Sequence, residues 1–81
     1  MPTAVPVAHA LGRAVRAIRS ERGLSQVQLA HATGFIQAWI IHVEHGRRNP
    51  SWNNVVRLAG GLGVRTSELV ARAEACAQEP E

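Results

Sequence analysis

The side chains best placed to do chemistry lie between residues 26 and 49, and they suit binding rather than reaction. Gln26, Gln37, His42 and the run Arg-Arg-Asn at 47–49 offer amide, imidazole and guanidinium groups that hydrogen-bond or hold an anion. The chain has no Asp, no pair of Glu on one helical face and no glycine-rich phosphate loop. Acid–base and nucleophilic catalysis therefore lack their usual groups. We expect a binding protein that is not an enzyme, with no cofactor and no small-molecule substrate.

The four histidines and the single cysteine do not predict a metal site either. His31, His42 and His45 have no acidic or cysteine partner at the spacing of metal ligands. No sequence pattern pairs Cys76 with an activating base, so we expect this thiol to pack rather than react. A lone cysteine fits a reducing cytosol, and neither a signal peptide nor an apolar run of about 20 residues is present. These features predict a cytoplasmic protein without metal or membrane contact.

Charge is distributed unevenly along the 81 residues, which are enough for one domain with a single core. All nine basic residues are Arg, and all six acidic residues are Glu. Residues 1–50 carry a net charge of +4 and residues 51–81 carry −1, which leaves the chain at +3. The basic first half gives mild support for a polyanionic partner.

The stretch 26–45 must position these polar groups, and its spacing is that of two short crossed helices. Ala30 supplies the small residue that lets two helix backbones approach, and Gly34 supplies a turn residue that adopts a positive φ without strain. Four apolar residues are expected to face inward from both helices: Leu29, Phe35, Ile40 and Val43. This pattern is typical of a helix-turn-helix, whose second helix enters the major groove of DNA.

Helical periodicity continues on both sides of this motif. A first helix at about 7–22 carries an apolar stripe and ends at Gly23, and Ser25 and Gln28 predict a capping box for the second helix. The third helix is expected at about 37–45 and is ended by Gly46. Ser51 caps a fourth helix whose inward face includes Trp52, which we expect in the core. A fifth helix starts near residue 66.

The sequence therefore predicts an all-α fold: a compact domain of five short helices over residues 7–77. Residues 1–6 are expected to form a flexible arm, and residues 78–81 a frayed tail. No strand period of two residues occurs anywhere.

Three segments of the chain resemble the lambda-repressor-like helix-turn-helix family, also called the Cro/CI or XRE type. They are RAIRSERGLSQVQLAHATGF, VEHGRRNPS and VVRLAGGLGVRTSEL, and the resemblance runs from about Leu11 to Leu69. It implies a five-helix DNA-binding domain of a bacterial or phage regulator, usually a dimer on inverted repeats. It also implies that an Arg19–Glu44 ion pair ties the first helix to the end of the third.

The resemblance assigns DNA contacts to particular positions. Gln37 matches a glutamine that reads adenine, and a bidentate pair of this kind is worth about 1–3 kcal/mol of discrimination. Ala38, Ile41 and His42 match the other groove-facing positions. Gln26 matches a phosphate contact, and Arg48 and Asn49 match a loop that grips the DNA backbone. From the residues themselves we add Arg47 to that basic loop. Trp39 should be half-buried, with its indole N–H near a phosphate.

Ile36 and Ile41 depart from the family pattern. Ile36 stands where Ser or Thr usually caps the recognition helix, which loses an N-cap worth about 1 kcal/mol. Ile36, Ala38 and Ile41 could pack on thymine methyl groups, the apolar feature of the major groove. They could equally form a protein-binding face, as in an antitoxin or an adaptor. That module is the alternative to our leading hypothesis.

The leading hypothesis is a transcriptional regulator, a repressor or autoregulator, that binds double-stranded DNA as a homodimer on an inverted repeat. Two recognition helices about 34 Å apart would meet successive major grooves. A regulatory protein partner and association with the nucleoid are further expectations. The dimer surface is expected on the fifth helix and the end of the fourth: Val64, Leu69, Val70, Ala73 and Cys76. The same stripe could instead close the core of the monomer.

Overall fold

The computed structural model describes residues 7–78, which form five helices and no strand. The helices are α1 (Val7–Glu21), α2 (Gln26–Thr33), α3 (Gln37–Glu44), α4 (Trp52–Leu62) and α5 (Thr66–Gln78). The predicted all-α, five-helix class is therefore confirmed. The predicted arm at 1–6 and the last three residues of the predicted tail lie outside the described residues, while Gln78 still belongs to α5.

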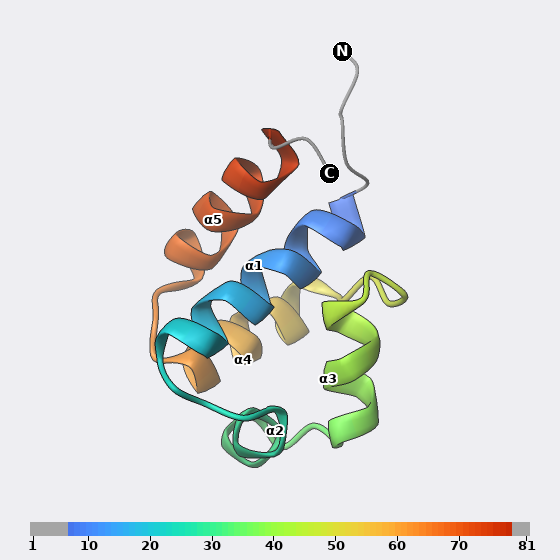
Figure 1. Ribbon diagram of the computed structural model, residues 1–81, viewed down its shortest axis with the longest axis vertical. Coiled ribbons are helices and arrows are strands. Elements are labelled where there is room, and N and C mark those ends of the chain that lie inside the picture. The colour runs from blue at the N-terminus through green and yellow to red at the C-terminus, as the bar shows by residue number, and fades with distance from the viewer. Residues whose placement is uncertain (1–6, 79–81) are drawn as a thin grey trace.

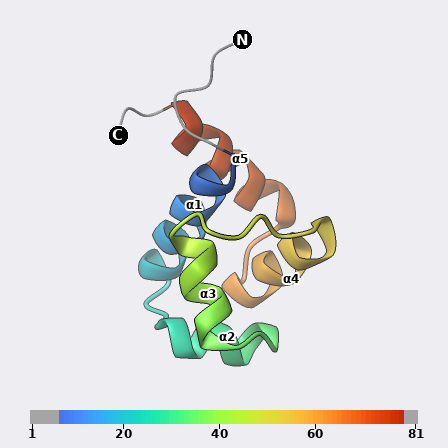
Figure 2. The same cartoon turned by 90° about the vertical axis from the view of Figure 1, so that its right-hand side faces the viewer.

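The helices enclose one core, with α1 at the centre of the molecule. Figure 1 shows α5 alongside α1, α4 behind it and α3 at its side, with α2 at the far end from the last turns of α5. Figure 2 shows the same arrangement with α3 toward the viewer and the segment that leads to α4 crossing in front. The largest fully buried side chains come from all five helices: Val15, Leu29, Ile40, Val43, Leu58, Leu62 and Leu69.

The closest approach between α1 and α3 occurs at Gly12. A Cβ added there would collide with the backbone carbonyl oxygens of Val43 and Glu44. The apolar stripe of α1 predicts which face is buried, but it gives no sign that one position must lack a side chain. Gly12 therefore sets how deeply α3 seats against α1.

The predicted capping of α2 is confirmed atom by atom. Ser25 Oγ accepts a hydrogen bond from the Gln28 backbone N–H at 3.0 Å, and Gln28 Oε1 accepts one from the Ser25 N–H at 2.8 Å. Gly34 follows α2 with φ +79° and donates its N–H to Ala30 O at 2.8 Å. The turn thus has the left-handed residue that the sequence predicted.

The expectation that Trp52 lies in the core is wrong. Ser51 caps α4 by accepting a hydrogen bond from the Asn54 N–H at 3.3 Å, so Trp52 is the first residue of the helix. Trp52 is 64% exposed, while Val55, one turn later, is buried. Helical periodicity gives the direction of a side chain but not whether a neighbouring helix reaches it.

Candidate nucleic-acid interface

The exposed surface of α3 is concentrated at its N-terminal end. Gln37 is the first residue of the helix and is exposed, as is Ala38 beside it. Ile36 occupies the N-cap position without a side-chain cap, and its side chain is 71% exposed. Ile41 and His42, one turn further, are half-buried. The end that carries Gln37 thus presents one amide flanked by two apolar side chains.

A buried ion pair anchors the other end of α3. Arg19 Nε lies 2.6 Å from Glu44 Oε2, and Arg19 Nη2 lies 3.1 Å from Glu44 Oε1. The two side chains are 13% and 2% exposed, respectively. The pair that the family resemblance implied is therefore present. Arg19 also donates through Nη1 to the Leu24 carbonyl at 2.9 Å, so that one guanidinium links α1, the turn before α2 and α3.

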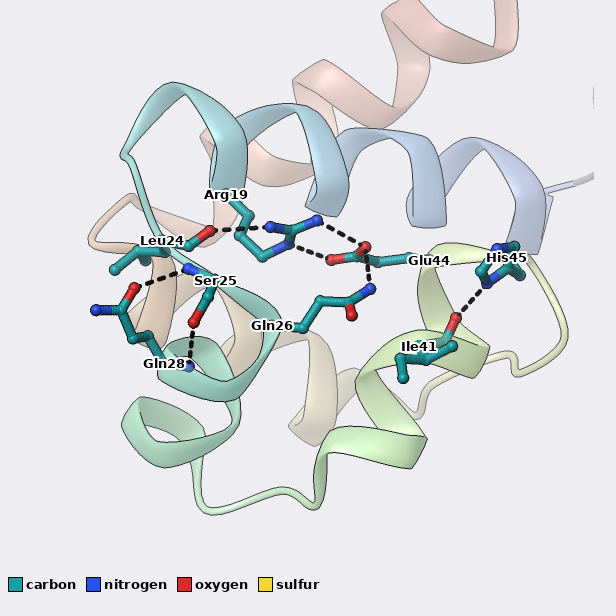
Figure 3. A network of polar contacts seen from close by, with 8 residues as sticks. All are labelled: Arg19, Leu24, Ser25, Gln26, Gln28, Ile41, Glu44 and His45. Carbon is teal, nitrogen blue, oxygen red and sulfur yellow. Dashed lines mark hydrogen bonds and ion pairs between the residues drawn. The ribbon is translucent and has the colours of Figure 1, made fainter.

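Gln26 joins the same network. Its Nε2 donates a hydrogen bond to Glu44 Oε1 at 3.1 Å, and Figure 3 shows this amide and the Arg19 guanidinium converging on the one carboxylate. The sequence predicted a phosphate contact for Gln26 and gave no hint of this second role. An amide nitrogen carries two hydrogens, so the bond to Glu44 uses one and orients the other.

A second cluster braces the turn between α2 and α3, and sequence reasoning missed it. The Phe35 and Trp39 rings pack against each other with centroids 4.2 Å apart and planes tilted by 34°, and Arg57 Cζ of α4 lies 4.2 Å from the Phe35 centroid. Arg57 Nη2 also donates to the Thr33 carbonyl at 2.6 Å. Trp39 is half-buried, as expected, because its ring packs on Phe35. The only local signal was an aromatic pair four residues apart.

A basic loop follows α3 directly. Gly46 ends the helix with φ +73°, and Arg47, Arg48 and Asn49 are all exposed. Within residues 7–78 neither guanidinium of this loop makes an ion pair or a side-chain hydrogen bond. Two positive charges thus lie in water at the end of α3 opposite Gln37.

The histidines contribute less than the loop does. His45 is exposed, and its Nδ1 lies 2.9 Å from the Ile41 carbonyl oxygen, where it can donate a hydrogen bond that closes the last turn of α3. In the described part of the chain no group of three or more His, Cys, Asp or Glu side chains is arranged to hold a metal ion.

The predicted dimer stripe requires a correction. Leu69 is 0% exposed and Cys76 is 5% exposed, and both pack in the core of the single chain. They cannot contact a second copy, because α5 turns them toward α1. Val64, Val70 and Ala73 are half-buried against that core. The stripe therefore closes the monomer, which was the open alternative, and only part of it reaches the surface.

A family model described as a helix-turn-helix domain matches residues 10–73. The chain belongs to this family. The match covers α2, α3 and α4 together with most of α1 and α5, and it confirms the lambda-repressor-like, XRE-type resemblance of the sequence. Helix-turn-helix proteins of this type are DNA-binding transcriptional regulators.

Three relatives illustrate the membership of the helix-turn-helix family. The immunity repressor protein of Bacillus phage phi105 is 38% identical over 60 residues, which are 74% of this chain but 42% of the repressor. The control protein C.BamHI of Bacillus amyloliquefaciens is 35% identical over 60 residues, 73% of this chain and 74% of that protein. The crystal structure of the restriction-modification controller protein C.AhdI from Aeromonas hydrophila is 35% identical with a TM-score of 0.74, covering 76% of this chain and 94% of that one.

No helix within residues 7–78 of this helix-turn-helix protein is long and apolar enough to cross a membrane.

Proposed function

We propose that the protein binds double-stranded DNA sequence-specifically, as a homodimeric repressor or autoregulator on an inverted-repeat operator. The observation that carries this proposal is the division of α3 into two ends. Glu44 is anchored from α1 and α2, while Gln37 and Ile36 are exposed at the other end. A helix fixed in this way can be laid into a major groove with little loss of conformational freedom.

Base reading would come from the exposed end of α3. Gln37 has the amide that pairs with adenine N6 and N7, and it lies free of the Glu44 network. Ile36 and Ala38 flank it and would contact thymine methyl groups, with Ile41 and His42 one turn behind. We therefore expect a half-site rich in A·T pairs at the positions that this end covers.

Phosphate binding would come from both sides of α3. Arg47, Arg48 and Asn49 form the exposed loop at its C-terminal end, and the half-buried Gln26 at the start of α2 has a second amide hydrogen that the bond to Glu44 does not use. Trp39 would add its indole N–H. Arg47 and Arg48 would neutralise about two phosphates per half-site, which gives a slope of log K against log salt near −1.8.

The competing hypothesis, a protein-binding module that uses the apolar end of α3, gains no support from the relatives. They are named as an immunity repressor and two controllers. We include in the proposal the role as a repressor, the inverted-repeat operator and the homodimer.

Selection from a random-sequence duplex library tests the proposal. We expect an inverted repeat whose half-sites contain the adenine read by Gln37, with an affinity well above the non-specific range of about 10⁻⁴–10⁻⁶ M. Gln37→Ala should lose about 1–3 kcal/mol at one base pair per half-site, whereas Arg48→Ala should weaken selected and random duplexes alike. Retention of no sequence above the non-specific range would refute the proposal.

A further inference from the structure

An open apolar groove lies beside the loop that follows α3. Its volume is about 350 Å³, and its lining includes Leu11, Pro50, Trp52, Val55, Ala73 and Ala77. These residues come from α1, the segment before α4, the start of α4 and the second half of α5. Glu74 is the one charged residue of the lining. A phosphate or a polar metabolite would find no cation here, so the groove suits an apolar occupant.

Trp52 projects from the same face that contains the groove. It is the largest of the exposed apolar side chains in residues 7–78, at 64% exposure, and Val7 across the groove is 74% exposed. An exposed indole at the rim of an apolar groove indicates an interaction surface. The molecule thus carries a projection and a hollow side by side.

We propose that the occupant is a second copy of this chain, with each Trp52 seated in the groove of its partner. A two-fold contact uses one surface patch on both copies, so that patch must contain both a projection and the hollow that receives it. The surface around Trp52 meets this condition. The proposal rests on the proposed function in one respect, since an inverted repeat requires two copies.

The area of the two Trp52 contacts is that of a weak, reversible dimer. Burying the exposed part of one indole removes roughly 100–150 Å² from water, and the groove loses a similar area. The two symmetric contacts then bury about 500 Å², a third of the roughly 1,600 Å² of a standard interface. Val7 and the half-buried Val70 and Ala73 are part of the groove lining and would be covered together with it. Of the dimer stripe predicted from sequence, only these last two residues are used.

The position of the groove also fits binding to DNA by two copies. Asn49 and Pro50 belong to its rim, so the interface adjoins the end of α3 that lies opposite Gln37. Each protomer measures 37 × 22 × 22 Å. Centres of two such bodies in contact lie roughly 22–37 Å apart, a range that includes the 34 Å between successive major grooves.

Sedimentation velocity of the full chain without DNA tests the interface. We expect a dimer for the wild type and at least a hundredfold larger dissociation constant for Trp52→Glu. Val56→Glu is the matched control, because Val56 is an exposed apolar residue of α4 outside the groove, and its dimer should match the wild type. Circular dichroism checks that each variant folds. A monomeric wild type, or equal weakening by both substitutions, would overturn the proposal and leave the groove to another apolar partner.

A mixing experiment tests the symmetry of the contact. Ala77→Trp fills the groove but keeps Trp52, whereas Trp52→Ala removes the projection but keeps the groove. Each variant alone should be monomeric, and the mixture should regain a dimer that retains one of the two contacts. Absence of a mixed dimer would contradict the paired arrangement.

Binding to a single half-site separates this proposal from the proposed function. Trp52→Glu should bind a half-site duplex as the wild type does, while Gln37→Ala should dimerise normally and lose base preference. If the protein dimerises through Trp52 but does not bind DNA, the proposed regulatory function is refuted and the proposed dimer interface stands.

Discussion

Replacement of Glu44 by Gln would remove the charge that anchors α3 while keeping the shape of the side chain. The carboxylate accepts two hydrogen bonds from Arg19 and one from Gln26, and it is 2% exposed. The neutral amide can still accept from Gln26, but it leaves the Arg19 guanidinium buried without a counter-charge. We therefore expect the folded state to lose most of the stabilisation that the pair provides.

The size of the loss follows from burial. Removing one partner of a buried ion pair costs about 3–5 kcal/mol. Because the Arg19 side chain keeps 13% exposure, water can solvate part of its charge, and we expect the lower end, about 3 kcal/mol. A chain of 81 residues has a total stability of about 4–12 kcal/mol, so this is at least a quarter of it. The thermal midpoint should fall by about 12–24 °C.

The assay is thermal and urea unfolding followed by circular dichroism, with Glu21→Gln as the matched control. Glu21 makes a bidentate pair with Arg72 at 2.7 and 2.8 Å, but both side chains are largely in water. Exposed pairs contribute little, so the control should move the midpoint much less. A loss below about 1 kcal/mol for Glu44→Gln, or equal losses at the two sites, would refute the argument that burial makes this pair the anchor.

The remaining predictions concern DNA and pH. Replacing the thymine beside the adenine read by Gln37 with uracil should weaken binding of the wild type severalfold, because the methyl contact with Ile36 is lost. In a titration of the thymine and uracil duplexes, Ile36→Ser should bind both with equal affinity. The salt slope of about −1.8 per half-site should become shallower by about one unit in Arg48→Ala, and an unchanged slope would exclude its phosphate contact. The Arg72 guanidinium holds the pKa of Glu21 below its usual value of 4.5. The Glu21–Arg72 pair therefore contributes its full share to the free energy of unfolding above pH 4.5 and loses it as the pH falls through the lowered pKa of Glu21. The urea midpoint of Glu21→Gln should accordingly depend less on pH below 4.5 than that of the wild type.

Local chemistry explains what could be predicted from the sequence. The capping box of Ser25 and Gln28 and the left-handed turn at Gly34 involve residues three or four apart, so spacing alone specifies them. The Arg19–Glu44 pair joins residues 25 apart and became predictable only through the family resemblance. The exposure of Gln37 and Ile36 was predicted from their place at the start of the recognition helix.

What could not be predicted depends on contacts between distant segments. Trp52 has the periodicity of a core residue, but it is the first residue of α4 and remains 64% exposed at the edge of the core. Gly12 lacks a side chain for a reason that lies in the backbone of α3. Arg57 reads as a surface arginine, yet it reaches Thr33 and Phe35 across 24 and 22 positions of sequence.

Because α3 is anchored at Glu44, a small tilt about its C-terminal end displaces its N-terminal end. From residue 37 to residue 44 the helix rises about 10 Å, so a tilt of about 5° around the anchored end swings Gln37 through nearly 1 Å. That displacement is larger than the spread of good hydrogen-bond lengths. Arg57 donates a hydrogen bond to the turn just before α3, so we expect it to influence the orientation of Gln37. Substitution of Arg57 should therefore change the sequence preference for operators while the affinity for non-specific DNA stays the same.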